Sequence, residues 1–176
     1  MELISEELVE TEVVEETALV VESHESAVSF LDDGNIDLVE KFEDDLDAQG
    51  LNEVPELNDS CLIAKITNGM YARALKMPAN MIITGALHKK NYIDIFISGD
   101  VTVKSYFANG EVEESERINS FRFFEGKAGR KRVLYTHKET LWVTVDPSTA
   151  ENLEEALDNI SCRQTGDYLK YQRSLE

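Results

Sequence analysis

The chain has 176 residues with 35 acidic and 17 basic side chains, a formal net charge of −18 and 42% hydrophobic residues. No apolar run approaches the ~20 residues of a transmembrane helix, and the first residues lack the basic and apolar stretches of a signal peptide. Because nucleic acids and anionic membranes attract Lys and Arg, this charge argues against binding to either by the whole surface. We expect no membrane partner, and no nucleic-acid partner except through a basic loop described below.

The charge divides the chain into parts. Residues 1–60 contain 20 acidic residues and one basic residue, Lys41, whereas residues 61–176 are nearly neutral. An acidic segment with few aromatic residues has little apolar surface to offset the entropy of its chain. The sequence therefore predicts an acidic N-terminal arm over residues 1–60 that is partly helical or disordered, a compact domain over residues 61–162, and a polar tail over residues 163–176.

Within the arm, the apolar pairs of residues 3–21 fit neither helical nor strand periodicity. Residues 36–46 predict a short amphipathic helix whose apolar face we expect to dock through Ile36, Val39, Phe42 and Leu46. A single apolar stripe must be covered by the same domain, a sister subunit or a partner. For the arm as a whole, three interpretations stay open: a solvated tail, a docking arm, or an acidic mimic of nucleic acid.

From residue 61 onwards, short β-prone runs alternate with turn signals such as Asn68-Gly69 and Asn109-Gly110. The expected strands are residues 61–66, 70–77, 81–87, 92–97, 101–107, 121–124, 131–135 and 141–145. Short strands at this spacing predict a sandwich or a closed barrel. A helix should follow Asp146-Pro147, with Ser148 and Glu151 as a capping box, and end near Ser161.

Two cysteines, Cys61 and Cys162, lie at the ends of the neutral region, and no Cys-x-x-Cys motif is present. We expect reduced thiols; a disulfide joining the two ends of the domain is the alternative.

Two segments carry a family resemblance. Residues 85–103 (GALHKKNYIDIFISGDVTV) resemble the first motif of a single-domain cupin, and residues 126–145 (GKAGRKRVLYTHKETLWVTV) resemble the second. More narrowly, the chain resembles small cupin-like proteins found mainly in tailed bacteriophages, over roughly residues 72–160. The resemblance implies a mainly β fold, a cupin-like jelly-roll barrel with a C-terminal helix.

Cupins that perform chemistry usually hold a divalent metal with His residues and a carboxylate, as the resemblance implies. In the first motif His88 stands alone, and in the second Arg132 takes the place of the usual His. The residues left as ligand contacts or remnants of a metal site are His88, Tyr92, Asp94, Arg132 and His137. Because nearby cations repel a metal ion, we expect no metal, no other cofactor and no catalytic residue. For His88, a hydrogen-bonded residue at the barrel mouth is the simpler interpretation.

A second candidate site is basic. We expect an interaction patch formed by Lys89, Lys90, Lys127, Arg130, Lys131 and Arg132. Such a loop is compatible with a solvated turn, with a phosphate or nucleic-acid site, or with pairing to the acidic arm within or between subunits. Arm pairing through exposed charges should be sensitive to salt.

Together, the lost ligand set, the two-part charge and the resemblance predict a non-enzymatic phage structural or assembly protein, such as a capsid decoration or a head or tail attachment protein. Its expected partners are copies of itself and other virion proteins, and its expected location is the virion or the cytoplasm of an infected bacterium. The alternatives are a cupin that binds a small ligand or is a metal-dependent enzyme, and an acidic, host-directed inhibitor that mimics nucleic acid.

Overall fold

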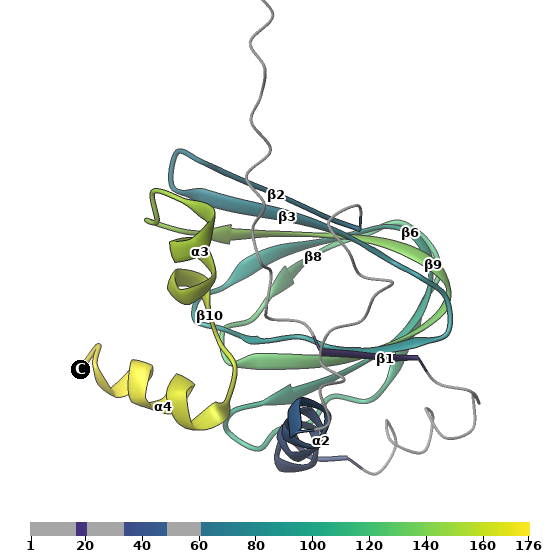
Figure 1. Cartoon of the computed structure of the whole chain (residues 1–176), viewed down its shortest axis with the longest axis horizontal. Helices are drawn as coiled ribbons and strands as arrows, with labels where there is room; N and C mark the ends of the chain where they lie inside the picture. Colours follow the sequence, from purple (N-terminus) through teal and green to yellow (C-terminus); the bar gives the residue numbers. More distant parts are fainter. Residues whose placement is uncertain (1–16, 21–33, 49–60) are drawn as a thin grey trace, which may run out of the picture.

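The computed structural model describes residues 17–20, 34–48 and 61–176, and its described part is mainly β (Figure 1). Two sheets face each other and share two long strands, β6 (Tyr92–Phe107) and β9 (Arg130–Pro147). One sheet runs β2 (Leu62–Thr67), β3 (Met70–Met77), the second half of β9, the first half of β6, and β8 (Arg122–Gly126). The other runs β1 (Thr17–Val20), β4 (Met81–Thr84), the first half of β9, the second half of β6, and β7 (Glu116–Ile118). This arrangement confirms the mainly β barrel.

The long strands bend where the sequence predicted turns. Residues 92–97 and 101–107 were expected as two strands but form the single strand β6, and residues 131–135 and 141–145 are likewise parts of β9. The β6–β9 register shifts between Phe96 and Val101, so that both strands pass from one sheet to the other. Gly99 lies in this bend at φ +123°, where a Cβ atom would collide with Thr140. Gly99 therefore marks a bulge and a sharp bend within one strand instead of a turn between two strands.

The core between the sheets is apolar and follows strand alternation. Its buried residues are Met77, Met81, Ile83, Phe96, Val101, Val103, Ile118, Leu134 and Trp142. At one end, helix α3 (Leu153–Ile160) packs Ala156 and Ile160 against Tyr71 of β3. Next to it, the short strand β10 (Ser161–Cys162) pairs with β5 (Leu87–His88). These elements cover the end of the barrel that holds the candidate site.

Helix α2 (Ile36–Ala48) lies on the outer face of the β1–β4–β9–β6 sheet, whereas α4 (Thr165–Arg173) extends away from the barrel and reaches the same apolar cluster through one residue (Figure 1). Helix α2 begins after Asn35, whose side chain accepts a hydrogen bond from the backbone N–H of Leu38. Of the four expected docking residues, Ile36, Val39 and Leu46 are buried, and Phe42 is half-buried. Helix α4 packs Tyr168 into the same cluster.

The structure corrects two local expectations, the cap of helix α3 and the polar tail. Helix α3 is capped by Asn152, which accepts a hydrogen bond from the backbone N–H of Glu155, and not by the Ser148–Glu151 box. The tail expected at residues 163–176 contains helix α4.

Most of residues 3–21 lie outside the described residues. Cys61 and Cys162 are not joined by a disulfide. Among the described residues, no helix has the length and apolarity to cross a membrane.

Candidate functional site

A buried carboxylate with several donors lies inside the barrel. Asp94 on β6 is fully buried, and its Oδ2 accepts from Nη2 of Arg130 at 3.1 Å and from Nη2 of Arg132. Its Oδ1 accepts from the indole Nε1 of Trp142 at 2.8 Å. Arg130, Arg132 and Trp142 all come from β9, where every second side chain points inward. One carboxylate therefore neutralises one of two adjacent guanidinium charges, and the cluster keeps a positive surplus.

Arg132 lies among aromatic rings. Its guanidinium carbon is 5.1 Å from the ring centroids of both Phe124 and Trp142, and 5.9 Å from that of Tyr92, within cation–π range. Burial disfavours the charged guanidinium, but the carboxylate of Asp94, by its charge and its hydrogen bond, helps to raise the pKa of Arg132 above its ordinary value. Burial also raises the pKa of Tyr92. We therefore treat Arg132 as a cation and Tyr92 as a neutral phenol at physiological pH.

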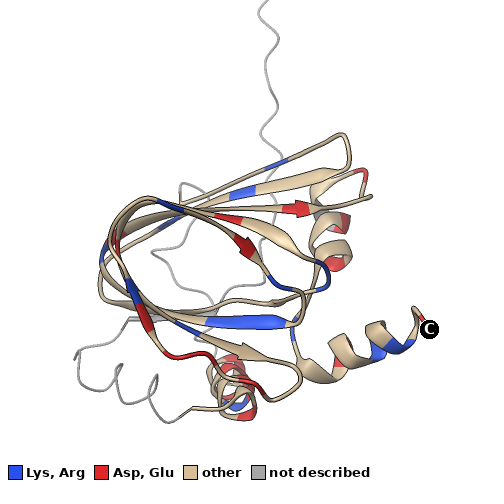
Figure 2. Cartoon of the chain, turned by 180° about the vertical axis from the view of Figure 1, so that it is seen from behind, with Lys and Arg blue, Asp and Glu red and all other residues tan. Residues whose placement is uncertain are grey.

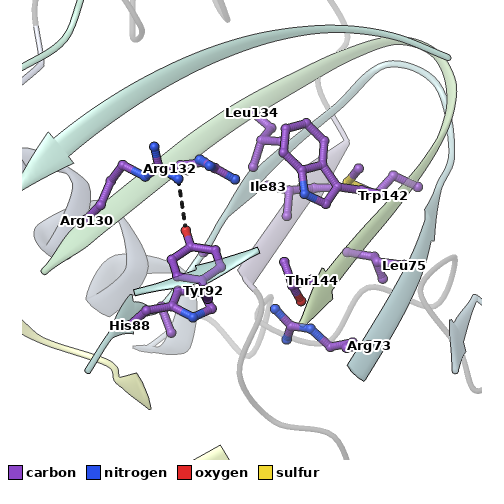
Figure 3. Close-up of a pocket in the computed structure, with 13 residues that line it drawn as sticks. Arg73, Leu75, Ile83, His88, Tyr92, Arg130, Arg132, Leu134, Trp142 and Thr144 are labelled. Carbon is purple, nitrogen blue, oxygen red and sulfur yellow. Dashed lines mark hydrogen bonds between the residues drawn. The ribbon is translucent and has the colours of Figure 1, made fainter. Parts of the chain in front are cut away.

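A cavity of about 50 Å³ opens beside this cluster, between the two sheets (Figure 3). Its polar lining is formed by Arg73, His88, Tyr92, Arg130, Arg132 and Thr144. Its apolar lining is formed by Leu75, Met77, Ile83, Ala86, Leu134 and Trp142. Two polar atoms of the lining residues, Nε of Arg130 and Oγ1 of Thr144, are buried and have no hydrogen-bond partner. Buried donors of this kind normally have a partner, so these two atoms mark where a ligand or an ordered water would bind.

His88 forms the floor of the cavity together with Tyr92. Its Nδ1 lies 2.7 Å from Oδ1 of Asp146, and its ring stacks on Tyr92 with centroids 3.7 Å apart. Tyr92 in turn accepts a hydrogen bond from Nη2 of Arg130 at 3.3 Å, drawn as the dashed line in Figure 3. The carboxylate of Asp146 fixes the imidazole through Nδ1 and leaves Nε2 for a ligand. The hydrogen bond expected for His88 is thus present, and the residue is buried in the lining of the cavity.

The five predicted ligand contacts separate into two groups. His88, Tyr92 and Arg132 line the cavity, and Asp94 lies directly behind Arg132. His137 lies at the bend of β9, where its Nε2 is 2.8 Å from the hydroxyl of Thr102, and it does not line the cavity. His137, which the sequence named as a possible ligand, is separated from the other four because β9 continues five residues beyond Arg132 and leaves the cavity.

The predicted basic patch is not one surface. Arg130 and Arg132 point into the barrel, whereas Lys131, between them, points outward beneath α2 and is also buried. Lys127 lies near Glu113, at 3.7 Å between the charged atoms. Lys89 donates to the backbone carbonyl of Asp158, and Lys90 is exposed. The run of cations was expected in a loop, but most of it lies in β9, so strand alternation sends neighbouring charges in opposite directions.

Lys131, the cation of β9 that points outward, forms an ion pair with helix α2 of the acidic segment. Nζ of Lys131 lies 2.9 Å from Oε2 of Glu43, and both side chains are almost completely buried. Burial raises the pKa of Glu43, although the charge of Lys131 opposes that rise. Further along α2, Asp47 pairs with Arg163, and Glu40 accepts from the backbone N–H and the hydroxyl of Thr165. Figure 2 shows the acidic helix beside the basic part of β9. Pairing between arm and barrel, one of the interpretations of the basic run, thus occurs within the chain.

Residues 1–16, 21–33 and 49–60 aside, no three His, Cys, Asp or Glu residues lie close enough to hold a metal ion together. In the barrel, the place that the resemblance assigns to a His is taken by Arg132, and the nearest carboxylate is occupied by two guanidinium groups. The residues present do not fit a divalent metal, which takes His nitrogens and free carboxylates. They fit an anion.

Several residues of the site were not singled out from the sequence. Arg73 and Thr144 lie on β3 and β9, and their alternation with Ala72, Ala74 and Val143 shows only that they share a face. Trp142 was interpreted as a core residue, and its hydrogen bond to Asp94 was not predicted. Glu43 was missed because a carboxylate on the apolar side of an amphipathic helix gives no signal until its buried partner is known.

No protein-family model matches the chain, and neither does any curated protein. Similar solved structures include a cupin-2 domain-containing protein from Shewanella frigidimarina, with 10% identity and a TM-score of 0.37 over 62% of this chain and 97% of that one. An RmlC-like cupin family protein with a double-stranded β-helix fold from Methanocaldococcus jannaschii has 11% identity and a TM-score of 0.39, over 54% and 89%. A hydroquinone 1,2-dioxygenase from Sphingomonas has 8% identity and a TM-score of 0.41, over 57% and 70%.

Two of these three structures are described as cupins, which is the fold class expected from the sequence. None of them indicates a phage origin. At these identities and TM-scores, no activity, ligand or partner transfers from them to this chain.

Proposed function

We propose that the chain is a ligand-binding protein whose barrel cavity holds a small carboxylate. The observation that carries the proposal is the sharing of one Asp94 oxygen by Arg130 and Arg132 beside a cavity. Leaving a buried charge without compensation is costly, so the second guanidinium favours a bound anion. Arg73, on the same lining, adds a further cation.

The lining favours a carboxylate over a fully polar anion. A planar carboxylate matches the fork of a guanidinium, and the free Nε of Arg130 and hydroxyl of Thr144 are donors that its oxygens can accept from. Beyond these donors the lining is aliphatic and aromatic, with Leu75, Ile83 and Leu134, which suits a short alkyl chain. The cavity is small, at about 50 Å³, which favours a short carboxylate over a bulky one.

This proposal develops the small-ligand alternative of the sequence. The single tryptophan, Trp142, lines the cavity and reports on binding by its fluorescence. We therefore propose titrating the full chain with acetate, butyrate and succinate, and with inorganic phosphate for comparison. At least one carboxylate should change the fluorescence saturably and raise the melting temperature.

Two variants locate the binding. Arg132→Gln should weaken binding at least tenfold, since a hydrogen bond to a charged group is worth about 1.5–3 kcal/mol. Thr144→Val keeps the shape of the side chain and should weaken binding by a smaller factor. Arg122→Gln removes an exposed cation on β8 and is the matched control for charge. Equal affinity of the Arg132 and Arg122 variants, or no response to any carboxylate, would contradict the proposal.

The phage assembly role, the virion partners and the absence of catalysis stay predictions from the sequence. Neither the fold nor the cavity bears on a role in a virion. The search for this chain in purified particles by mass spectrometry is the test of that role.

A further inference from the structure

On the solvent-facing side of one sheet, one row of residues is apolar from edge to edge. Strand pairing aligns one row of residues across it: Ile63, Ala74, Val143, Ile95 and Phe123. Directly opposed residues in antiparallel strands point to the same side of the sheet. Asp94 and Phe96 point into the barrel, so Ile95 and its row point outward.

The two ends of this row are exposed, and its three central residues are half-buried. Ile63 on β2 and Phe123 on β8 are both 61% exposed, and Ile97 and Phe121 near the same edge are 39% and 67% exposed. In the part of the chain that the structure describes, α2 and Tyr168 of α4 pack against the other sheet, and α3 packs against the inner side of β2 and β3. A monomer rarely exposes a contiguous apolar patch of this kind without a partner.

The next row along the strands carries complementary charges at its two ends. It runs Lys65, Ala72, Val145, Ile93 and Glu125. The centre of this row is uncharged, one edge carries a cation and the other an anion. β9 is the middle strand of the face, flanked by β3 and β2 on one side and by β6 and β8 on the other.

We propose that this face is the interface with a second copy of the chain. A twofold axis that lies in the interface along β9 places β2 of each copy over β8 of the other. Ile63 then meets the second copy's Phe123, and Lys65 meets the second copy's Glu125. In this arrangement apolar residues meet apolar residues and a cation meets an anion. The same patch is therefore complementary to itself, as an isologous dimer requires. Because the face is the outer side of the sheet, the carboxylate cavity on the inner side stays independent of it.

The first measurement is the mass of the full chain by sedimentation velocity over a range of concentrations. We expect twice the 19.9 kDa of one chain at high concentration. Phe123→Ser should raise the dimer dissociation constant at least tenfold. Leu175→Ser is the matched control, since Leu175 is 67% exposed and lies at the C-terminus, away from the face. A monomer at every concentration, or a dimer that Phe123→Ser leaves unchanged, would overturn the proposal.

Exchanging the charges of Lys65 and Glu125 tests the position of the proposed twofold axis. Lys65→Glu and Glu125→Lys should each weaken the dimer, because each puts like charges opposite each other across the interface. The double exchange should restore the dimer. Within one chain these residues are about 20 Å apart, from four strand spacings, so one substitution cannot compensate the other inside a monomer. Failure of the double exchange to restore the dimer would overturn the proposed twofold arrangement.

Discussion

At the scale of single residues, Asp94 decides the chemistry of the barrel. Its carboxylate is fully buried and takes hydrogen bonds from two guanidinium groups and one indole. The alternation with Ile93 and Ile95 showed that Asp94 faces away from both, but the sequence left open which side is the interior. Because the sheet closes with Phe96 inside, the carboxylate points inward as well.

We expect Asp94→Asn to destabilise the chain by about 3 kcal/mol, because removing one member of a buried charge cluster leaves uncompensated cations. Asp100→Asn is the matched control on the same strand. Asp100 pairs with Arg117 through two hydrogen bonds of 2.8 Å, and the Arg117 side chain is 57% exposed. Because the Arg117 guanidinium is open to solvent, which screens the pair, Asp100→Asn should destabilise the chain clearly less than Asp94→Asn. Urea unfolding followed by Trp142 fluorescence measures both, and similar losses in the two variants would count against the role of Asp94.

At the scale of elements, α2 and β9 depend on each other. The helix of the acidic segment lies on the outer face of the sheet, with Glu43 against Lys131 in a contact closed to water. The apolar periodicity predicted the helix and most of its buried face correctly. It could not predict the ion pair, since a buried charge on each element makes sense only when the two are packed together.

Replacing only one residue of the Glu43–Lys131 ion pair should lower the free energy of unfolding more than replacing both residues. Lys131→Met leaves the Glu43 carboxylate buried without its cation, and we expect a loss of about 3 kcal/mol in the free energy of unfolding. The double variant with Glu43→Leu should recover most of that loss, because a buried ion pair is often equalled by apolar residues of similar size. Lys138→Met, an exposed lysine on the same strand, is the control. A double variant no more stable than the single one would refute the proposed coupling.

At the scale of the whole molecule, the barrel is held by its own side chains. The interior contains an apolar core between the sheets and, at one end, the Asp94 cluster with Arg130 and Arg132. In a barrel that binds a metal, part of the stability would come from the bound ion. Here Arg132 stands at the place that the resemblance assigns to a His ligand, and its charge is neutralised in part by Asp94.

We therefore expect the melting temperature of the full chain to be the same after dialysis against a chelator and after addition of Zn²⁺, Mn²⁺ or Fe²⁺. A metal present at 100 times its dissociation constant would stabilise the fold by about 2.7 kcal/mol, a shift of several degrees that calorimetry resolves. His88→Ala should respond as the parent chain does. A metal-dependent rise that His88→Ala abolishes would show that the site takes a cation after all.

The sequence by itself determined the β-rich domain and the short helix on the acidic segment, because these follow from local periodicity and turn signals. It named His88, Tyr92, Asp94, Arg132 and His137 as candidate ligand contacts but did not show which of them share a cavity. It did not determine that β6 and β9 are each one bent strand, since a turn and a bulge share the same glycine signal. Nor could it place Arg130 and Arg132 inside and Lys131 outside. Which face of a strand points inward is fixed only when both sheets close on a common core. That closure turns Arg130 and Arg132 toward the cavity and Lys131 toward α2.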